Sequence, residues 1–515
     1  MPTFLPAGAP SGAFSVLYRD KADRLQALLE IAKALKEERE LDRLLQRIVS
    51  EAARVVDADR GTLFLVDLDS GALWSKIAQG IGGEIRIPKG TGIAGLVAET
   101  GQVVNLDDAY GDARFNPAVD RSTGYHTRTL LCVPMYNSRG DVVGVLQLLN
   151  KRDGVFDHDD EELLLALGGQ AASAVENALL HDEITRLFEG FVQASVVAIE
   201  ARDPTTAGHS ERVAKLTLGI ADALEIHGTA RWSGLIFSSA QRMELRYAAL
   251  LHDFGKVGVR EDVLIKANKL YPMQLELVRM RFALAKKSLE VEHLRHCVAL
   301  LRAGAAHERV ADLDAEFASK IAEIDAVLAI AEAANHPTVL PAGSFEALQR
   351  GAALRFSVIN GQTMPLLTAP EIELLSIPRG TLSAAERREV ESHVSHTFRF
   401  LSQIPWSRGL RRVPEIAHGH HEQLNGSGYP QGLPATDIGV EARMMAVADI
   451  YDALTASDRP YKKAIPHTNA LRILEDEAER GSLDLELVHL FRAGRVAERV
   501  MGDKFTDSRR ISGVF

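Results

Sequence analysis

The pattern of apolar and polar positions changes character along the chain. From residue 21 to 56, apolar residues recur at helical spacing around a charged break at 39–42, which predicts two amphipathic helices. Strand-like segments follow, with turn residues at 69–71 and 138–141 between hairpin partners: "GTLFLVDLDSGALWSKIAQ", "EIRIPKGTGIAGLVAETGQVVNL" and "TRTLLCVPMYNSRGDVVGVLQLLNK". We therefore expect an α+β domain in which helices flank an antiparallel sheet.

Helical patterns dominate the remainder of the chain. The segment beginning at Asp157, "DHDDEELLLALGGQAASAVENALL", carries acidic residues in its first turn, as helix N-termini favour, and then a long helical period. Strand patterns nearly vanish beyond residue 190, so we predict an all-α domain there. Residues 273–335 are rich in Ala, Leu and Glu and show no catalytic residue type at a suggestive spacing; they predict an inserted helical hairpin that turns near Leu301–His307.

The length of 515 residues exceeds what one hydrophobic core usually serves, which favours a multidomain protein. The patterns divide it into four predicted parts. These are a mobile N-terminal tail (1–20), an α+β domain with its leading helix (21–180), a connector helix (181–200) and the all-α domain with its insertion (190–515).

Composition narrows the functional classes. Hydrophobic residues make up 46% and charged residues 25%, as in ordinary globular proteins, and the net charge of −11 argues against a protein that coats nucleic acid polymers or anionic membranes. No apolar run approaches the ~20 residues of a membrane span, and the start lacks the features of a signal peptide. The two cysteines, Cys132 and Cys297, cannot build a disulfide framework. We expect a cytoplasmic protein without membrane insertion.

Histidines and aspartates gather in the all-α domain in a pattern that suits metal binding. Neutral imidazoles and ionised carboxylates can hold metals without thiolates. Neighbouring side chains on a helix diverge by about 100°, so an adjacent pair such as His252 and Asp253 suits two metals, or one metal and its bridge. Apolar residues flank these positions, so burial without a metal would be costly. The candidates are His209, His252, Asp253, His393, His396, His420, His421, Asp449 and Asp452.

One lysine and two histidines of this domain have more than one interpretation. Lys256 lies one helical turn after His252, where a cation could orient a phosphate, but a lysine at a helix end near two glycines could equally be a solvated surface residue. For His396 and His418 the simpler interpretation is a hydrogen-bonded core histidine.

Residues from about Leu41 to Leu180 resemble a GAF domain. The resemblance rests on "DADRGTLFLVD", "GTGIAGLVAETG", "NLDDAYGDARFNP" and "NKRDGVFDHDDE". The last of these matches the pattern in the GAF domains of cyclic-nucleotide phosphodiesterases, through Asn150, Lys151, Phe156, Asp160 and Glu161. The pattern admits a structural interpretation, in which Lys151 and Asp160 form an ion pair that ties the last strand to the following helix. No GAF ligand follows from the sequence.

The all-α domain resembles the HD-GYP subfamily of HD-domain phosphohydrolases, which hydrolyse cyclic di-GMP. The resemblance covers about Val192–Arg279 and Ile377–Leu474, through "ARDPTTAGHSERVA", "LHDFGKVGV", "HHEQLNGSGYPQGL" and "AVADIYDALTASDRPYKKA". It implies a bridging and catalytic role for Asp253, phosphate orientation by Lys256, and substrate contacts from Tyr429 and Arg459. The metal ligands it implies are His209, His252, Asp253, His393, His420, His421 and Asp449.

Three positions depart from the family pattern. Thr205 stands where some relatives have a glutamate for a third metal, so we expect two divalent metal ions, iron or manganese rather than zinc because no thiolate is present. Thr397 replaces a glycine, which puts the local helix packing in question. Asn425 replaces a more common aspartate, a change that we expect to be tolerated.

The resemblance implies a metal-dependent cyclic di-GMP phosphodiesterase that produces pGpG or GMP under the control of a GAF sensor. Two metals would lower the pKa of the attacking water and hold the phosphoryl oxygens. Two alternatives stay open: a cyclic-dinucleotide receptor that signals through its helices without turnover, and a hydrolase of another cyclic dinucleotide or nucleotide phosphate. We also expect a homodimer formed through the GAF and connector helices.

Overall fold

The computed structural model describes two compact units, residues 1–189 and 190–515, apart from the segments that follow. Its described residues are 26, 29–35, 38, 40–67, 70–78, 85–202, 207–228, 230–304, 307–337, 344–358, 361–456 and 464–502. The predicted tail (1–20), Thr205 and Arg459 lie outside them.

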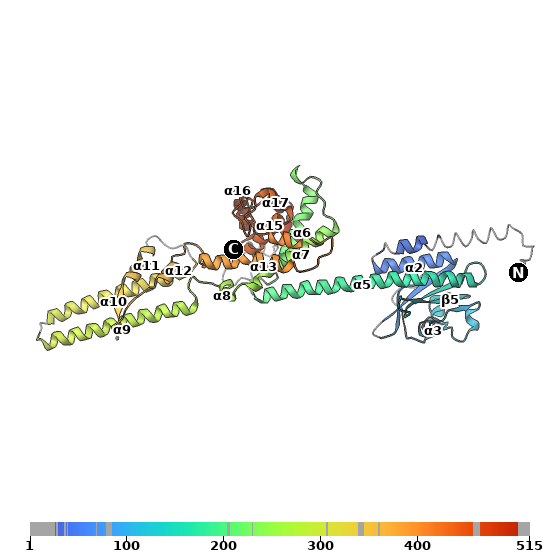
Figure 1. Cartoon of the computed structure of the whole chain (residues 1–515), viewed down its shortest axis with the longest axis horizontal. Coiled ribbons are helices and arrows are strands. Elements are labelled where there is room, and N and C mark those ends of the chain that lie inside the picture. The colour runs from blue at the N-terminus through green and yellow to red at the C-terminus, as the bar shows by residue number, and fades with distance from the viewer. Residues whose placement is uncertain are drawn as a thin grey trace, which may run out of the picture. The chain divides into compact units, whose positions relative to one another are not determined.

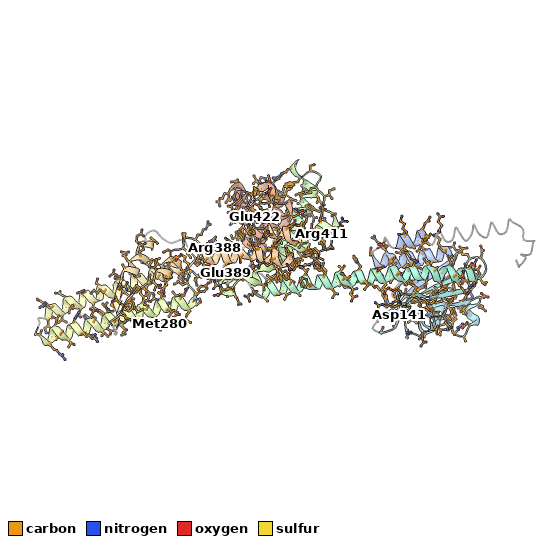
Figure 2. The ribbon with its side chains drawn as sticks, viewed as in Figure 1. Asp141, Met280, Arg388, Glu389, Arg411 and Glu422 are labelled. Atoms are coloured by element: carbon orange, nitrogen blue, oxygen red, sulfur yellow. The ribbon has the colours of Figure 1, made fainter. Side chains whose placement is uncertain are left out.

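The first unit is built on a six-stranded antiparallel sheet (Figure 1). The strand order is β3-β2-β1-β6-β5-β4, and the turns after β1 and β5 join the hairpins that the sequence predicted. Asp141, labelled in Figure 2, ends the β5–β6 turn, where its main-chain carbonyl accepts from the Asn137 amide. The strands are β1 (Ala58–Val66), β2 (Leu73–Ala78), β3 (Ile85–Ile87), β4 (Val104–Leu106), β5 (Leu130–Tyr136) and β6 (Val142–Lys151).

Helices cover both faces of this sheet because the strands alternate apolar side chains between the two sides. Leu63 and Leu65 of β1 join the core beneath α2 (Leu41–Val55) and the first half of α5 (His158–Arg202). Phe64, between them, joins the opposite core beneath α3 (Gly92–Thr100). A short helix, α4 (Ala118–Thr123), and a 3-10 turn, η1 (Ala109–Gly111), complete the unit. The predicted α+β architecture is therefore correct.

The motif "NKRDGVFDHDDE" holds the end of β6 to the start of α5. Lys151 forms an ion pair with Asp160, and both side chains are largely buried. Asn150, at φ +56, accepts from the Arg128 and Thr129 amides. Asn105 donates to the Glu161 carboxylate over 2.9 Å. These contacts agree with the structural interpretation of the motif.

Helix α5 runs unbroken for 45 residues, and the division between the two units falls within it. By length and composition alone it could cross a membrane, a property that the apolar core helices of soluble proteins share. In the first unit its apolar side chains face the sheet: Leu164, Leu167, Ala171 and Val175 are fully or almost fully buried. The predicted connector (181–200) is thus the second half of a helix that begins in the GAF-like unit.

The second unit is largely helical. Helix α6 packs against α7, α15, α17 and α18. The helices are α6 (His209–His227), α7 (Ser239–Leu251), α8 (Glu261–Leu264), α12 (Ala369–Leu375), α13 (Ala384–Leu401), α14 (Val413–His418), α15 (Val440–Thr455), α16 (His467–Glu479), α17 (Leu485–Ala493) and α18 (Val496–Met501). Among the described residues, 3-10 segments join these helices at η3 (Ala230–Trp232), η4 (Phe254–Gly258) and η5 (Ala435–Asp437).

Two long helices, α9 (Pro272–Arg302) and α10 (His307–Asn335), lie side by side within this unit (Figure 1). They share a separate hydrophobic core with α11 (Ser344–Ala353) and α12. A two-stranded sheet, β7 (Arg355–Ser357) and β8 (Thr363–Pro365), lies beside them. The prediction of an all-α domain missed the β7–β8 pair because three-residue strands are too short to show a period of two.

Candidate metal centre

Five separate segments of the second unit bring their chemistry-bearing side chains to one buried place. His209 begins α6, His252 and Asp253 join α7 to η4, and His393 lies in α13. His420 and His421 follow α14, and Asp449 lies in α15. Three overlapping groups have ligand atoms within 4.8 Å of one another, and together they contain all seven expected ligands: His393–His420–His421, His209–His252–Asp449 and His252–Asp253–His420.

The two carboxylate oxygens of Asp253 face different histidines. Oδ2 lies 3.6 Å from Nε2 of His209 and 3.5 Å from Nε2 of His252. Oδ1 lies 3.2 Å from Nε2 of His393, on the other side. A carboxylate placed between two histidine groups in this way can bridge two metal ions.

Three histidines are held with one ring nitrogen ready to bind. Nδ1 of His252, His393 and His420 each donates to the main-chain carbonyl three residues earlier, over 2.7, 2.6 and 2.6 Å. These bonds place the proton on Nδ1 and leave the lone pair on Nε2. Each of the three Nε2 atoms is buried and accepts no hydrogen bond. Buried nitrogen lone pairs without hydrogen-bond partners, beside ionised carboxylates, are typical of metal ligands.

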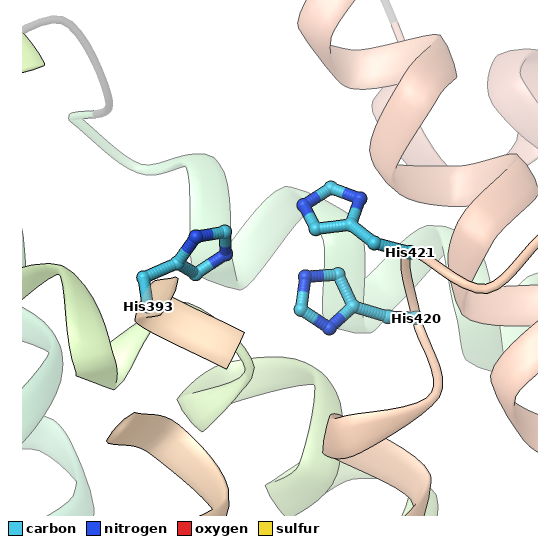
Figure 3. Close-up of side chains that lie close together, drawn as sticks. All are labelled: His393, His420 and His421. Atoms are coloured by element: carbon cyan, nitrogen blue, oxygen red, sulfur yellow. The ribbon is translucent and has the colours of Figure 1, made fainter. Parts of the chain in front are cut away.

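Figure 3 shows His393 on α13 facing His420 and His421 across the centre. The rings of His420 and His421 lie 4.0 Å apart, and His421 lies 5.3 Å from His393 between ring centroids. Tyr429 stacks at an angle on His421 at 4.7 Å, and its amide donates to the His421 carbonyl. The predicted substrate contact Tyr429 thus lies at the edge of the histidine group.

His209 is fixed by a second carboxylate. Its Nδ1 lies 2.8 Å from Oδ2 of Asp452. The Arg212 guanidinium donates to both oxygens of the same carboxylate, to Oδ1 over 2.6 Å and to Oδ2 over 3.0 Å. Nε2 of His209 is thereby turned toward Asp449, 3.2 Å away. Asp452 was a candidate in the sequence but was left out of the ligand set that the resemblance implies. In the structure it is a positioning residue, of the kind that orients metal-ligating histidines.

The protonation states of the centre are those that metal ligands need. Burial lowers the pKa of His252, lowers the pKa of His420 well below its usual range, and lowers the pKa of His421 to about 4. Burial alone would raise the pKa of Asp253, but Lys256 and the neighbouring histidines hold it well below its usual range. These histidines are therefore neutral and this carboxylate ionised at neutral pH.

His209 differs from the other histidines. Burial lowers its pKa, but hydrogen bonds to Asp449 and Asp452 outweigh burial and raise the pKa to about 9. The pKa of Asp449 is lowered in turn, because its contact with His209 outweighs burial. The carboxylates thus favour positive charge at this point, which a proton or a divalent cation can supply.

Lys256 lies at the rim of the centre in η4. Its Nζ is 2.7 Å from Oδ2 of Asp253, and the side chain is mostly buried. The alternative of a solvated surface lysine is therefore wrong.

Thr397 replaces the glycine of the family pattern without disturbing the packing. Its hydroxyl donates to the His252 carbonyl over 2.9 Å and accepts from the Gly255 amide over 2.8 Å. A Cβ on Gly255 would lie 1.9 Å from the His393 carbonyl oxygen, so only glycine allows η4 to approach α13 this closely. The sequence could not show this because Thr397 contacts residues more than 140 positions away.

The loop after the paired histidines is held by Glu422. This buried carboxylate accepts from the amides of Gln431 and Leu433, over 2.7 and 2.9 Å. A Cβ on Gly428 would lie 2.2 Å from the Gln423 amide, so the loop closes only with glycine there. Asn425 is exposed, and its Oδ1 accepts from the Ser427 amide, as an aspartate would. Glu422 was not among the predicted site residues.

His396 and His418, which were expected outside the metal centre, belong to none of its three groups of ligand atoms. His418 stacks on Phe398 with ring centroids 4.4 Å apart. Nδ1 of His396 is buried against Gly258 and makes no hydrogen bond to the described residues. On the hairpin, where the sequence showed no suggestive spacing, His293, Cys297 and Asp314 lie together, and His293 pairs with Asp314 over 3.0 Å.

Comparison with known families assigns both units. The GAF domain family matches residues 40–175, and the HD domain family matches twice, at residues 206–336 and 362–487. The first HD match contains His209, His252 and Asp253, and the second contains the other four expected ligands. Because these residues converge on one centre, the two matches contribute to a single site on either side of the hairpin.

Known proteins share part of this chain. A probable 3',5'-cyclic phosphodiesterase of Caenorhabditis elegans is 38% identical over 173 residues, covering 31% of this chain and 24% of the relative. A dual 3',5'-cyclic-AMP and -GMP phosphodiesterase of Takifugu rubripes is 36% identical over 177 residues, covering 32% and 20%. The chain thus spans about a quarter of the length of these curated relatives, or less.

Among solved structures, the GAF domain of a Coxiella burnetii phosphoenolpyruvate-protein phosphotransferase is 22% identical, with a TM-score of 0.29. The match covers 31% of this chain and 96% of that domain. The family matches at residues 40–175, 206–336 and 362–487 by themselves show that the chain contains a GAF domain followed by a largely helical HD-domain region.

Proposed function

We propose that this protein is a metal-dependent phosphodiesterase whose substrate is a cyclic dinucleotide, with cyclic di-GMP as the first candidate and pGpG or GMP as product. The observation that carries the proposal is the set of three buried, unpartnered Nε2 atoms on His252, His393 and His420 around the Asp253 carboxylate. The HD-domain matches and the cyclic nucleotide phosphodiesterases among the relatives support the same reaction class.

Two divalent ions, iron or manganese, would be held by the seven residues of the three groups: His209, His252, Asp253, His393, His420, His421 and Asp449. When bound, such ions lower the pKa of water and withdraw charge from phosphoryl oxygens. Asp253, whose two carboxylate oxygens face different histidines, would help to hold both ions. The hydrogen bonds from Nδ1 of the three histidines to main-chain carbonyls keep Nε2 aimed at the centre without reorganisation.

Lys256 would stabilise the negative charge of the phosphoryl group in the transition state. Its ammonium lies beside Asp253, so a phosphate next to the bridging carboxylate would also lie within its reach. Tyr429 would contact the substrate from the loop that Glu422 holds. Arg459, outside the described residues, would supply a bidentate phosphate contact.

A second candidate substrate is a 3',5'-cyclic mononucleotide, which the names of the relatives favour. The loop ending in Tyr429 and Pro430 favours the larger dinucleotide, through the resemblance stated above. A third candidate is a receptor that binds the dinucleotide without turnover.

One assay separates these functions. The full chain, loaded with Fe²⁺ or Mn²⁺, is incubated with cyclic di-GMP, cyclic GMP and cyclic AMP, and products are resolved by chromatography. Formation of linear pGpG or GMP from cyclic di-GMP supports the proposal. Hydrolysis of cyclic GMP or cyclic AMP alone would show that the substrate is a cyclic mononucleotide instead. Binding without product identifies a receptor. His252→Ala and Asp253→Ala should abolish hydrolysis while the helical circular dichroism persists; full activity in either variant contradicts the metal assignment.

The protein would be cytoplasmic, and its GAF domain would regulate the hydrolase activity. Two copies of the chain would form a homodimer through the GAF and connector helices. Helix α5 supports this proposal because it belongs to the GAF core at one end and continues into the second unit. Deletion of residues 1–157 should leave a hydrolase whose rate no longer responds to candidate GAF ligands such as cyclic GMP.

A further inference from the structure

Helix α9 carries two apolar faces, and only one of them is covered within the second unit. Val278, Phe282 and Ala285 are fully buried against the hairpin core. Eight large apolar residues on the same helix are 39–71% exposed. They are Met273, Leu277, Met280, Leu284, Val291, Leu294, Val298 and Leu301. Met280 is labelled on α9 in Figure 2.

The exposed residues follow a heptad repeat. Their spacings alternate between four and three residues from Met273 to Leu301, if Lys287 is counted as one position of the series. In heptad terms Leu277, Leu284, Val291 and Val298 occupy a positions. Met273, Met280, Leu294 and Leu301 occupy d positions. A repeat sustained over four heptads is the seam of a coiled coil, and Val at a with Leu at d in its second half favours two strands.

This seam lies on the opposite side of α9 from its partner α10. Met280 is two residues from both Val278 and Phe282, which places it about 160° from each of them around the helix axis at 100° per residue. Helix α10 shows no comparable surface: among the described residues, its apolar side chains are absent from the large exposed ones. The buried face of α9 therefore packs within the helical hairpin, whereas the seam would be buried only by a helix from outside it.

The charged residues that flank the seam indicate which helix pairs with α9 and whether the two helices run parallel or antiparallel. Glu290 occupies a g position and Arg295 the following e position, the two positions that meet between chains in a parallel coiled coil. In an antiparallel pair e would face e and g would face g, so Glu290 would not meet Arg295, and with the seams fully overlapped Arg281 of one copy would lie opposite Arg295 of the other. We propose that α9 pairs with α9 of a second copy of this chain, parallel and in register. This surface is separate from the GAF and connector helices.

Lys287 is the one charged residue within the seam, at a d position, and it pairs with Glu290 over 2.6 Å in its own chain. A single polar position in a seam fixes register at a cost in stability. Lys287→Leu should therefore tighten the association, since it completes the apolar series.

Cysteine cross-linking in the full-length chain tests this proposal. The background is Cys297→Ser, because the other cysteine, Cys132, is fully buried in the GAF core. In a parallel register Val291 faces its own copy within disulfide reach, whereas Glu292, one residue further round the helix, does not. Under mild oxidation Val291→Cys should form a covalent dimer and the matched control Glu292→Cys should not. If neither variant cross-links, or both do so equally, the proposal is overturned.

A second experiment disrupts the apolar seam by substitutions at residues that are exposed in the single chain, so the fold should be retained. Leu284→Glu with Leu294→Glu, both exposed in the single chain, should lower the cross-linking of Val291→Cys by roughly tenfold or more and leave the circular dichroism spectrum unchanged. His296→Glu adds an acidic residue at an exposed position off the seam and should leave cross-linking intact. Undiminished cross-linking in the double glutamate variant contradicts pairing through α9. The cross-link does not depend on catalysis, so this result and that of the hydrolysis assay stand separately.

Discussion

The hydroxyl of Thr397 in α13 donates a hydrogen bond over 2.9 Å to the main-chain carbonyl of His252, the residue that caps the C-terminal end of α7. The same hydroxyl accepts from the Gly255 amide. Thr397→Val keeps the shape but leaves both buried main-chain groups without a partner. We expect the free energy of unfolding to fall by about 1–3 kcal/mol, measured by urea denaturation. Thr397→Ser is the matched control and should retain most of the stability; equal stability of the valine variant would show that the contact is incidental.

Asp452 should control metal affinity through His209. In Asp452→Asn the side chain no longer balances Arg212 and holds His209 less firmly, so His209 Nε2 is no longer fixed toward Asp449. Loss of such a positioning contact typically weakens metal binding by about 10–100-fold. Competition with a chromogenic chelator measures the affinity directly. An unchanged affinity, with normal helical content, would assign Asp452 and Arg212 a purely structural role.

Glu422 should affect the substrate rather than the metals. Glu422→Gln can accept from only one of the Gln431 and Leu433 amides, which loosens the loop that carries Tyr429. We expect KM to rise by roughly tenfold or more, with metal content by mass spectrometry unchanged. Ser427→Ala, on the exposed part of the same loop, is the control and should behave as the parent. A loss of metal in the glutamine variant, with KM unaltered, would contradict this assignment.

Glu386 should make stability depend on acid pH. Burial alone would raise its pKa, but hydrogen bonds from Lys266, Ser383 and Tyr271 lower the pKa to about 2. A carboxyl whose pKa is lower in the folded than in the unfolded chain stabilises the fold above about pH 4.5. That contribution disappears as the pH falls toward 2.

Glu386→Gln leaves the buried Lys266 ammonium without its charge partner, and we expect a loss of about 3–5 kcal/mol at pH 7. The difference between the two proteins should shrink as the pH falls below 4.5, because the parent also loses the carboxylate. Denaturation midpoints across this pH range provide the measurement. The exposed pair Arg260–Glu389 is a suitable control, since Glu389→Gln should cost 1 kcal/mol or less. A constant difference between parent and Glu386→Gln at all pH values would rule out the ionised pair as its cause.

Local signals in the sequence were sufficient for much of the fold. Turn residues at 138–141 predicted the β5–β6 hairpin, and the acidic start at Asp157 predicted the beginning of α5. The adjacent pairs His252–Asp253 and His420–His421 indicated the centre because two neighbouring metal-binding side chains are difficult to explain otherwise. Short strands such as β7 and β8 give no comparable period.

The positioning contacts could not be predicted because they join residues distant in sequence. Asp449 and Asp452 lie three residues apart in α15, on similar faces, and the sequence does not show which one meets a metal and which one holds His209. The apolar richness of α9 was visible, but only the structure distinguishes its covered face from its exposed one.

The unpartnered Nε2 atoms of His252, His393 and His420 also link the folding equilibrium to the composition of the solution. Each desolvated lone pair costs about 1–3 kcal/mol when nothing binds it, and an ion that binds only the folded chain returns that cost by mass action. The melting temperature should thus rise with the logarithm of free Fe²⁺ or Mn²⁺. Chelation should therefore lower the melting temperature of the second unit, even when no substrate is present.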